Sequence, residues 1–345
     1  MIQADETGFE RDIASQAEAL LAYSATPLPQ FLTNLAFSAF DRIILTGMGS
    51  SDYVTMGIEL ALARKGLPVW RIQTSHLLQA MARITPRTLI WVVSQSGWSG
   101  EIVSLLERLK THPHGPIIGI TNDAESALGR AADHLILLQS GTEATVSTKS
   151  YINTLASLYR VEAAIAGQED AKTVQTLRQL AAQIASATQT IPAGIQSMAM
   201  RAMATTRPRF ALIGAGVDAI TALTGALIMK EASKVAAEGY IGGEFRHGPL
   251  EIAGPGLTAL LFSNEREDIT LSALAKDIAA TGSQVLVIGP HGLPGAEHFK
   301  IAGQPDVARL ALAMIFIQHF SVALARIGGY APGDFLYGRK VTSQI

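Results

Sequence analysis

The sequence predicts an α/β protein whose parallel β-sheets are covered by helices on both faces. Short, wholly apolar segments alternate with helical stretches such as Tyr53–Arg64 and Glu101–Lys110. Strands that are apolar on both faces are typical of parallel sheets, because crossover helices bury the sheet from both sides. In the first half of the chain we expect strands at Arg42–Leu45, Val69–Ile72, Thr88–Ser94, Ile117–Thr121 and Leu135–Leu138.

The same pattern begins again in the second half of the chain. Arg42–Gly49 and Arg209–Gly216 share the template R-x-x-L-x-G-x-G. Strands at Thr258–Phe262 and Val285–Ile288 follow the second copy, and a final helix runs from about Val307 to Arg326. A repeated strand–helix order built on one template indicates an internal duplication.

Composition narrows the classes of function. The chain has 345 residues, which suits two domains, with 48% hydrophobic and 16% charged residues. A net charge of −2 without a basic block argues against nucleic acid as a partner. With no cysteine, disulfides and thiolate chemistry are excluded. The polar start of the chain does not resemble a signal peptide, and the apolar run Leu310–Ile317 is too short to span a membrane, so we expect a cytoplasmic protein.

The segment from Ser94 to Glu101 is the most informative part of the sequence. A buried strand ends at Ser94, and hydroxyl and glycine residues then lead into a helix. The N-terminus of a helix that follows a parallel strand attracts anions, because its N–H groups are unpaired there. Ser94, Ser96 and Ser99 add hydroxyl donors, which favours a phosphorylated ligand over an ordinary capped turn. P-loop spacing is missing, so a nucleoside triphosphate is disfavoured.

Two glycine-rich loops allow a different interpretation. Gly214–Ala219 fits the dinucleotide pattern G-x-G-x-x-A, whereas Asp52 replaces the third glycine in the loop that begins at Gly47. The acidic residues that follow, Glu231 and Glu238, do not lie where a ribose-binding acid is expected, at the end of the next strand. We therefore expect no nucleotide cofactor.

Acid–base chemistry has two candidate residues, Glu231 and His247. Glu231 lies on an apolar helix, where partial burial would raise the pKa of its carboxyl group, and His247 lies between glycines. The alternative is structural: Glu231 would pair with Lys230 or Lys234, and His247 would only stabilise its loop. The histidines have no metal-site spacing, so no metal is expected.

Together these segments resemble the double sugar-isomerase (SIS) domain family, from about residue 38 to the end of the chain. Its members include the isomerase half of glucosamine-6-phosphate synthase, SIS-type glucosamine-6-phosphate deaminases and fructosamine-6-phosphate deglycases. Gly243–Glu251 is most like the deglycases, whereas Ser94–Gly97 and Ser147–Lys149 are most like the synthase and the deaminases.

The resemblance implies a fold and an organisation. Each SIS domain is a flavodoxin-like three-layer αβα sandwich. We expect an N-terminal helical segment at 1–36, a first SIS domain at 37–200, a second at 201–330, and a C-terminal tail at 331–345 that completes the active site. Family members are usually homodimers with a composite active site.

The resemblance also implies roles for single residues. Glu231 matches a proton-shuttling glutamate and His247, sixteen positions later, a ring-opening histidine. Lys340 is the candidate for a tail lysine that forms a Schiff base, with Arg339 one position away. The residues implied in binding the sugar phosphate are Gly49, Ser50, Ser51, Ser94, Gln95, Ser96, Ser99, Val146 and Ser147.

The sequence departs from the synthase pattern at two points. Ile228 stands where the synthase has a lysine, and this sequence includes no glutamine amidotransferase domain. The leading expectation is therefore a phosphosugar isomerase/deaminase that converts glucosamine 6-phosphate to fructose 6-phosphate and ammonia. A fructosamine-6-phosphate deglycase and a non-catalytic sugar-phosphate sensor are the alternatives.

Overall fold

The computed structural model describes residues 5–190, 194–264 and 269–342. They form two compact units, each built around one β-sheet. The sheet-1 unit comprises residues 16–143, 147–181 and 337–342, and the sheet-2 unit comprises residues 5–15, 144–146 and the described part of 182–336. The last residues of the chain thus belong with the first sheet.

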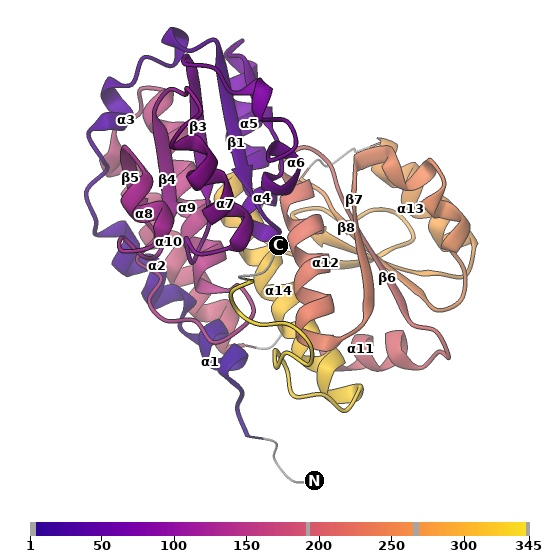
Figure 1. Ribbon diagram of the computed structural model, residues 1–345. Coiled ribbons are helices and arrows are strands. Elements are labelled where there is room, and N and C mark those ends of the chain that lie inside the picture. The colour runs from indigo at the N-terminus through magenta and orange to yellow at the C-terminus, as the bar shows by residue number, and fades with distance from the viewer. Residues whose placement is uncertain (1–4, 191–193, 265–268, 343–345) are drawn as a thin grey trace. The chain divides into compact units, whose positions relative to one another are not determined.

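Both sheets are parallel, have five strands and share one topology (Figure 1). The first has the order β2-β1-β3-β4-β5 and the second the order β7-β6-β8-β9-β10. This 2-1-3-4-5 order is that of flavodoxin-like folds, as expected. The strands are β1 (Arg42–Gly47), β2 (Val69–Arg71), β3 (Thr88–Val93), β4 (Ile117–Thr121), β5 (His134–Leu137), β6 (Arg209–Gly214), β7 (Ala236–Ile241), β8 (Leu257–Phe262), β9 (Gln284–Gly289) and β10 (Glu297–Lys300).

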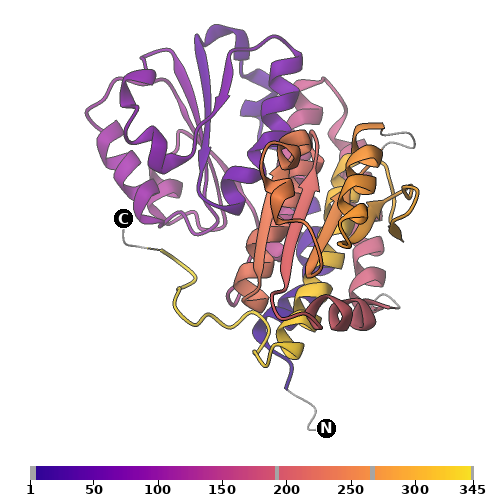
Figure 2. The same cartoon turned by 90° about the vertical axis from the view of Figure 1, so that its right-hand side faces the viewer.

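Helices flank the second sheet on both sides. Figure 1 shows α12 and α14 on one face and α13 on the other, and Figure 2 shows the strands side by side. The face towards α13 carries an apolar core that includes Ile213, Phe245 and Leu274. Helical elements of this unit are α1 (Gly8–Ala14), α11 (Ile195–Met203), α12 (Asp218–Ser233), α13 (Ile269–Ala280), α14 (Asp306–Ile327) and the 3₁₀ turns η3 (Gly242–Arg246) and η4 (Pro249–Ile252).

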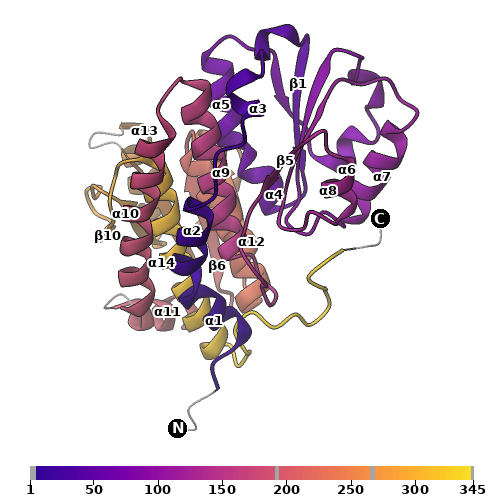
Figure 3. The ribbon, with the colours of Figure 1, turned by 90° about the vertical axis from the view of Figure 1, so that its left-hand side faces the viewer.

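The first sheet is sandwiched in the same way. In Figure 3, α6, α7 and α8 lie on one face, and α5 and α9 on the other. Its elements are α2 (Gln16–Ser24), α3 (Phe31–Asn34), η1 (Phe37–Ala39), α4 (Ser50–Tyr53), α5 (Thr55–Arg64), α6 (Thr74–Leu77), η2 (Met81–Arg83), α7 (Gly100–Leu109), α8 (Ala127–Ala131) and α9 (Lys149–Ile165). Helix α10 (Asp170–Gln189) begins in this unit and ends in the sheet-2 unit.

Helix α14 is the one helix within the described ranges that is long and apolar enough to cross a membrane. However, 78% of its most apolar window is buried inside the protein, and α14 packs against α11 and α12. The core helix of a globular unit has this same composition, because it is surrounded by apolar side chains. We therefore interpret α14 as a core helix.

The template arginine and the first template glycine have the same structural tasks in both halves. A Cβ atom on Gly47 would lie 2.9 Å from the main chain of Ser51, and one on Gly214 would lie 2.4 Å from that of Asp218. Arg42 Nη1 donates to the Arg83 carbonyl (2.6 Å), and Arg209 Nη2 to the Ile252 carbonyl (3.1 Å). The shared template thus fixes how each half folds.

Candidate functional site

The loop after β3 is shaped by its own serine hydroxyls. Ser94 is buried, and its Oγ accepts a hydrogen bond from the Gly97 amide (3.1 Å). Ser96 Oγ accepts one from the Trp98 amide (3.2 Å). Ser99 is the N-cap of α7, yet its side chain makes no capping bond. A hydroxyl that accepts one bond still has its proton to donate, so this loop retains donors suited to an anion.

Gly97 is required by packing. Its φ of +66° lies in the left-handed region, and a Cβ atom there would lie 2.1 Å from Ser126 Oγ. The α-carbon of Gly97 packs against Ser126, the N-cap of α8, so no other residue fits.

The loop after β1 lies beside this one. Gly49, with φ of +54°, is followed by Ser50 and Ser51 in the short helix α4. Because β1 and β3 are neighbours whose crossover helices leave in opposite directions, their carboxyl ends flank the topological switch point of the sheet. Ligands bind at such points in open α/β sheets, so Ser50, Ser51 and Ser94 lie on the favoured edge.

Asp52, which stands where a dinucleotide loop wants glycine, has a structural role. It is buried and pairs with Arg71 of β2 (2.5 Å). Burial raises the pKa of the Asp52 carboxyl group, and the Arg71 guanidinium offsets only part of that effect. Asp52 therefore ties α4 to the edge strand.

Asn122 joins three of the loops at this sheet edge, and the sequence reasoning missed it. Its main-chain amide donates to the Gln95 carbonyl (2.9 Å). In the side chain, Oδ1 accepts from the main-chain amide of Ser140 (2.8 Å), and Nδ2 donates to the Gly141 carbonyl (2.9 Å). It comes directly after the buried strand β4, and that position was the available signal. Asn122 fixes Gln95 relative to the loop after β5.

Glu143 organises the loop after β5, and it too was missed. Its side chain is fully buried. Oε1 accepts from the amide (2.7 Å) and hydroxyl (2.9 Å) of Thr148 and from the Ser150 amide (3.1 Å). Oε2 accepts from the Ser150 hydroxyl (2.8 Å) and from Lys340 Nζ (2.5 Å). Burial alone would raise the pKa of Glu143, but the Lys340 ammonium and these hydrogen bonds outweigh it and lower the pKa.

The C-terminal tail is held at this edge by two contacts. Lys340, whose side chain is 24% exposed, pairs with Glu143, and the Gly100 amide donates to the Thr342 carbonyl (2.9 Å). The first amide of α7, which the sequence offered as an anion donor, is therefore occupied by the tail. In return, the tail brings a lysine to the loops of the first sheet.

Two further predicted binding residues lie in the loop after β5. Ser147 Oγ is hydrogen-bonded to Ser150 Oγ (2.9 Å), so it joins the group around Glu143. Val146 as a whole residue is 1% exposed, so it offers almost no accessible surface to a ligand in this structure. Lys149 Nζ donates to the Thr142 carbonyl (2.5 Å) and so braces the loop.

Glu231 lies in the last turn of α12, in the sheet-2 unit. Lys230 pairs with Glu238 (3.5 Å), while Lys234 Nζ donates to the main-chain carbonyls of Glu231 (2.5 Å) and Asp334. Burial lowers the pKa of Lys234, which caps α12 in the left-handed conformation (φ +58°). These lysine contacts tie the end of α12 to the segment around Asp334.

His247 ends η3 in the same unit, on a loop whose neighbours are anchored. Phe245 is fully buried and packs edge-on against Tyr240 (5.0 Å), and Arg246 forms an ion pair with Asp277. Glu244 accepts a hydrogen bond from the Ile241 amide (3.1 Å). Because the anchors hold this loop, the exposed His247 has a defined position at its surface.

The structure thus divides the predicted residues between the units. The sheet-1 unit gathers its share at the carboxyl edge of its sheet, and the sheet-2 unit holds the two acid–base candidates and Val146. The first group is Gly49, Ser50, Ser51, Ser94, Gln95, Ser96, Ser99, Ser147 and Lys340. Across the described ranges, no three His, Asp or Glu side chains gather as a metal site would require.

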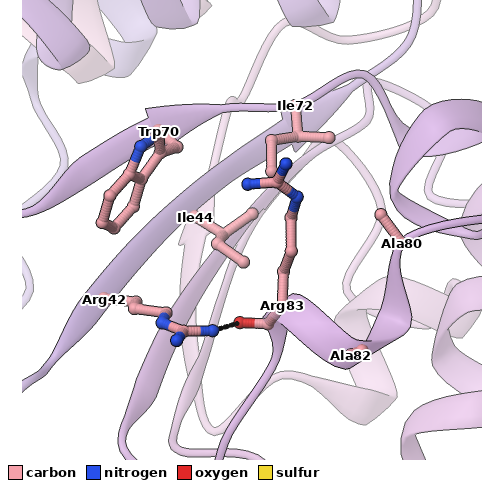
Figure 4. Close-up of a pocket in the computed structure, with 7 residues that line it drawn as sticks. All are labelled: Arg42, Ile44, Trp70, Ile72, Ala80, Ala82 and Arg83. Carbon is pink, nitrogen blue, oxygen red and sulfur yellow. Dashed lines mark hydrogen bonds between the residues drawn. The ribbon is translucent and has the colours of Figure 1, made fainter.

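A hollow of about 540 Å³ lies elsewhere in the sheet-1 unit (Figure 4). Arg42 and Arg83 border it together with Ile44, Trp70 and Ile72. Its lining includes Arg42 at the start of β1 and does not include Ser50, Ser51 or Ser94.

Comparisons with known proteins agree with this architecture. Residues 37–165 and 203–291 match the SIS domain family. A glutamine–fructose-6-phosphate aminotransferase of Staphylococcus epidermidis is 31% identical over 260 residues, which cover 73% of this chain and 43% of that protein. The chain thus spans less than half the length of this curated relative.

Solved structures share the fold over nearly the whole chain. The C-terminal domain of glucosamine-fructose-6-phosphate aminotransferase from Francisella tularensis aligns with a TM-score of 0.84 at 20% identity, covering 96% of this chain and 99% of the other. Glucosamine-6-phosphate deaminase from Thermotoga maritima aligns with a TM-score of 0.74 at 21% identity, covering 97% and 99%. With two matching segments on two sheets of one topology, the chain belongs to the SIS domain family.

Proposed function

We propose that this protein is a phosphosugar isomerase/deaminase that converts glucosamine 6-phosphate and water to fructose 6-phosphate and ammonia. The observation that carries the proposal is the set of hydroxyl groups at the carboxyl edge of the first sheet, together with Lys340, which Glu143 in the loop after β5 holds at the same edge. Uncharged donors at a sheet switch point suit a sugar phosphate. A lysine at the same edge adds the amine that carbonyl chemistry uses.

The proposed reaction has three steps. His247 assists opening of the sugar ring, which exposes the C1 aldehyde. Glu231 takes the proton from C2 and returns it to C1, while one proton passes from the C2 amine to O1, so that the aldehyde becomes a hydroxyl group and the amine an imine. Lys340 then adds to C2 and ammonia leaves, and water releases the ketose from the lysine. The Ser94–Ser99 loop, with Ser50 and Ser51, holds the phosphate during these steps.

Ammonia release tests the proposal. We expect the purified protein to release ammonia and fructose 6-phosphate in equal amounts from glucosamine 6-phosphate. Glu231→Gln should lower kcat by 100-fold or more with little effect on binding, because general acid–base catalysis contributes about 10²–10⁴ in rate. Glu238→Gln, on a neighbouring element and 63% exposed, is the matched control and should keep full turnover.

A deglycase is the second candidate, favoured by the string Gly243–Glu251. A deglycase would use the same acid–base pair to split a fructosamine 6-phosphate into sugar phosphate and amine. Turnover of that compound without ammonia release from glucosamine 6-phosphate would select it. Tight binding of both compounds with no turnover would instead identify a sugar-phosphate sensor.

A further inference from the structure

The ion pair between Glu143 and Lys340 poses a chemical problem for the proposed function, on which this inference rests. An amine attacks a carbonyl or imine carbon only through the lone pair of its neutral form. Lys340 Nζ lies 2.5 Å from a carboxylate oxygen, a contact that favours the protonated ammonium. Some group must therefore take a proton from Lys340 before it can react.

Glu143 is placed to take this proton, because its Oε2 contacts Lys340 Nζ. The Lys340 ammonium helps to lower the pKa of Glu143, and that charge disappears when the proton is transferred. The Glu143 side chain has no exposed surface. When a proton passes from Lys340 to Glu143, both charges disappear together, so neither group is left buried as an unpaired ion. The contact of 2.5 Å requires no movement of either heavy atom for the transfer.

The carboxylate is also held in place for this task. Two amides and two hydroxyls, from Thr148 and Ser150, fix both of its oxygens. Oε2, which faces Lys340, accepts only the Ser150 hydroxyl among these four donors. The tail is fixed independently by the bond from Gly100 to the Thr342 carbonyl. The pair therefore keeps its geometry without help from a ligand.

We propose that Glu143 is the positioning residue that docks Lys340 and takes its proton, which makes the amine a nucleophile towards C2 of the open-chain sugar. With fructose 6-phosphate, Glu143 accepts one proton from Lys340. The C2–N bond forms, and the carbonyl oxygen takes one proton from the nitrogen and one from Glu143. It leaves as water, and a protonated imine remains beside a carboxylate. The overall change is ammonium plus ketone to iminium plus water.

Reductive trapping measures this step directly. The full-length protein is incubated with fructose 6-phosphate and cyanoborohydride, which reduces the imine to a stable secondary amine, and the modified Lys340 peptide is quantified by mass spectrometry. We expect Glu143→Gln to slow labelling of Lys340 by 100-fold or more at pH 7, the lower end of the range for a general base. Glu125→Gln, at an exposed ion pair with Arg130 in the same unit, is the matched control, and its labelling should stay within threefold of wild type.

The pH profile separates proton acceptance from a purely structural role. The charged group that contacts the carboxylate is Lys340 from the tail, and Lys149, six residues after Glu143, donates from its Nζ to the Thr142 carbonyl. In Glu143→Gln, labelling should rise with pH, because hydroxide in the solvent then removes the proton that Glu143 takes in the wild type. A structural defect would leave the labelling low at every pH.

The outcomes are distinct from those of the ammonia assay. If Glu143→Gln labels as fast as wild type, Glu143 is not the acceptor, whatever the ammonia assay gives. If wild-type Lys340 is not labelled although ammonia is released, the deaminase function stands and the role of the pair is overturned. If Glu143→Gln does not fold, Glu143→Asp takes its place, because it keeps a carboxylate on a shorter side chain. We expect Glu143→Asp to label Lys340 about tenfold more slowly than wild type. Labelling as fast as wild type would overturn the proposal. Lys340→Arg, which cannot form the imine, is the blank.

Discussion

The packing constraint at Gly97 gives the sharpest test of how the Ser94–Ser99 loop of the sheet-1 unit is built. A Gly97→Ala substitution would place Cβ 2.1 Å from Ser126 Oγ and 2.5 Å from Ser126 Cβ, at a φ of +66°. The left-handed conformation costs an L-residue about 1–2 kcal/mol. Overpacking adds about 1–3 kcal/mol. We therefore expect the free energy of unfolding to fall by about 2–5 kcal/mol.

Gly141 provides the matched control. It has nearly the same φ, +65°, and a loop position in the same unit, but a Cβ atom there would meet nothing within 4 Å. Gly141→Ala should therefore cost only the conformational part, about 1–2 kcal/mol. The difference between the two variants isolates the contact with Ser126.

Removing the obstacle should rescue the variant. Ser126→Gly deletes the side chain that meets the new Cβ, and glycine replaces an N-cap serine at a cost of only a few tenths of a kcal/mol. Urea unfolding of the single and double variants gives their free energies of unfolding. Titration calorimetry with glucosamine 6-phosphate gives the affinity of each variant for the sugar phosphate. Equal destabilisation by Gly97→Ala and Gly141→Ala, or no rescue by Ser126→Gly, would refute the packing argument.

Three further predictions concern charge and binding. Arg309→Met should cost about 3–5 kcal/mol of unfolding free energy, because it leaves the buried Asp218 without its partner. Arg87→Met, at an exposed pair, should cost less than about 1 kcal/mol in the same urea titration. Sugar phosphate should change the fluorescence of Trp98, which is 44% exposed between Ser96 and Ser99, and Trp98→Phe should abolish that change. The folded-state pKa of Glu143 is lowered, so the stability it contributes is fully present above its unfolded pKa of about 4.3 and is lost as the pH falls through the lower folded value. The difference in unfolding free energy between wild type and Glu143→Gln should therefore shrink as the pH is lowered through this range.

The strands that the sequence predicted carry mostly apolar runs. β3, β4, β8 and β9 are buried almost throughout, because helices cover both faces and a strand lies on each side. The edge strands β2 and β5 of the first sheet were also predicted, to within one residue at each end. The two strands that were missed, β7 and β10, are the edges of the second sheet, where β7 is an Ala- and Gly-rich segment and β10 a polar one. Their composition, and not the edge position alone, hid them from a pattern based on apolar runs.

The residues of the candidate site also differ in how well a local sequence pattern identifies them. Ser50, Ser94 and their neighbours could be predicted, because each follows a buried strand and a local pattern identifies that position. Glu143 could not be predicted, because its partner Lys340 lies 197 positions away in the sequence. In the sequence, Glu143 is one acidic residue in a hydroxyl-rich loop. Only the docked tail makes it the buried half of an ion pair.

The R-x-x-L-x-G-x-G template reveals the duplication but does not indicate the function. In both halves the first template glycine admits the helix that follows, and the template arginine closes the turn before the third strand of its sheet. These tasks belong to folding, and any sequence that keeps this topology needs them. The proposed chemistry lies in what each half adds beyond the template: serine loops and a docked lysine in one, Glu231 and His247 in the other. Substituting Arg42 or Arg209 should therefore lower stability, whereas substituting Ser94, Glu143 or Lys340 should change how the protein handles a sugar phosphate.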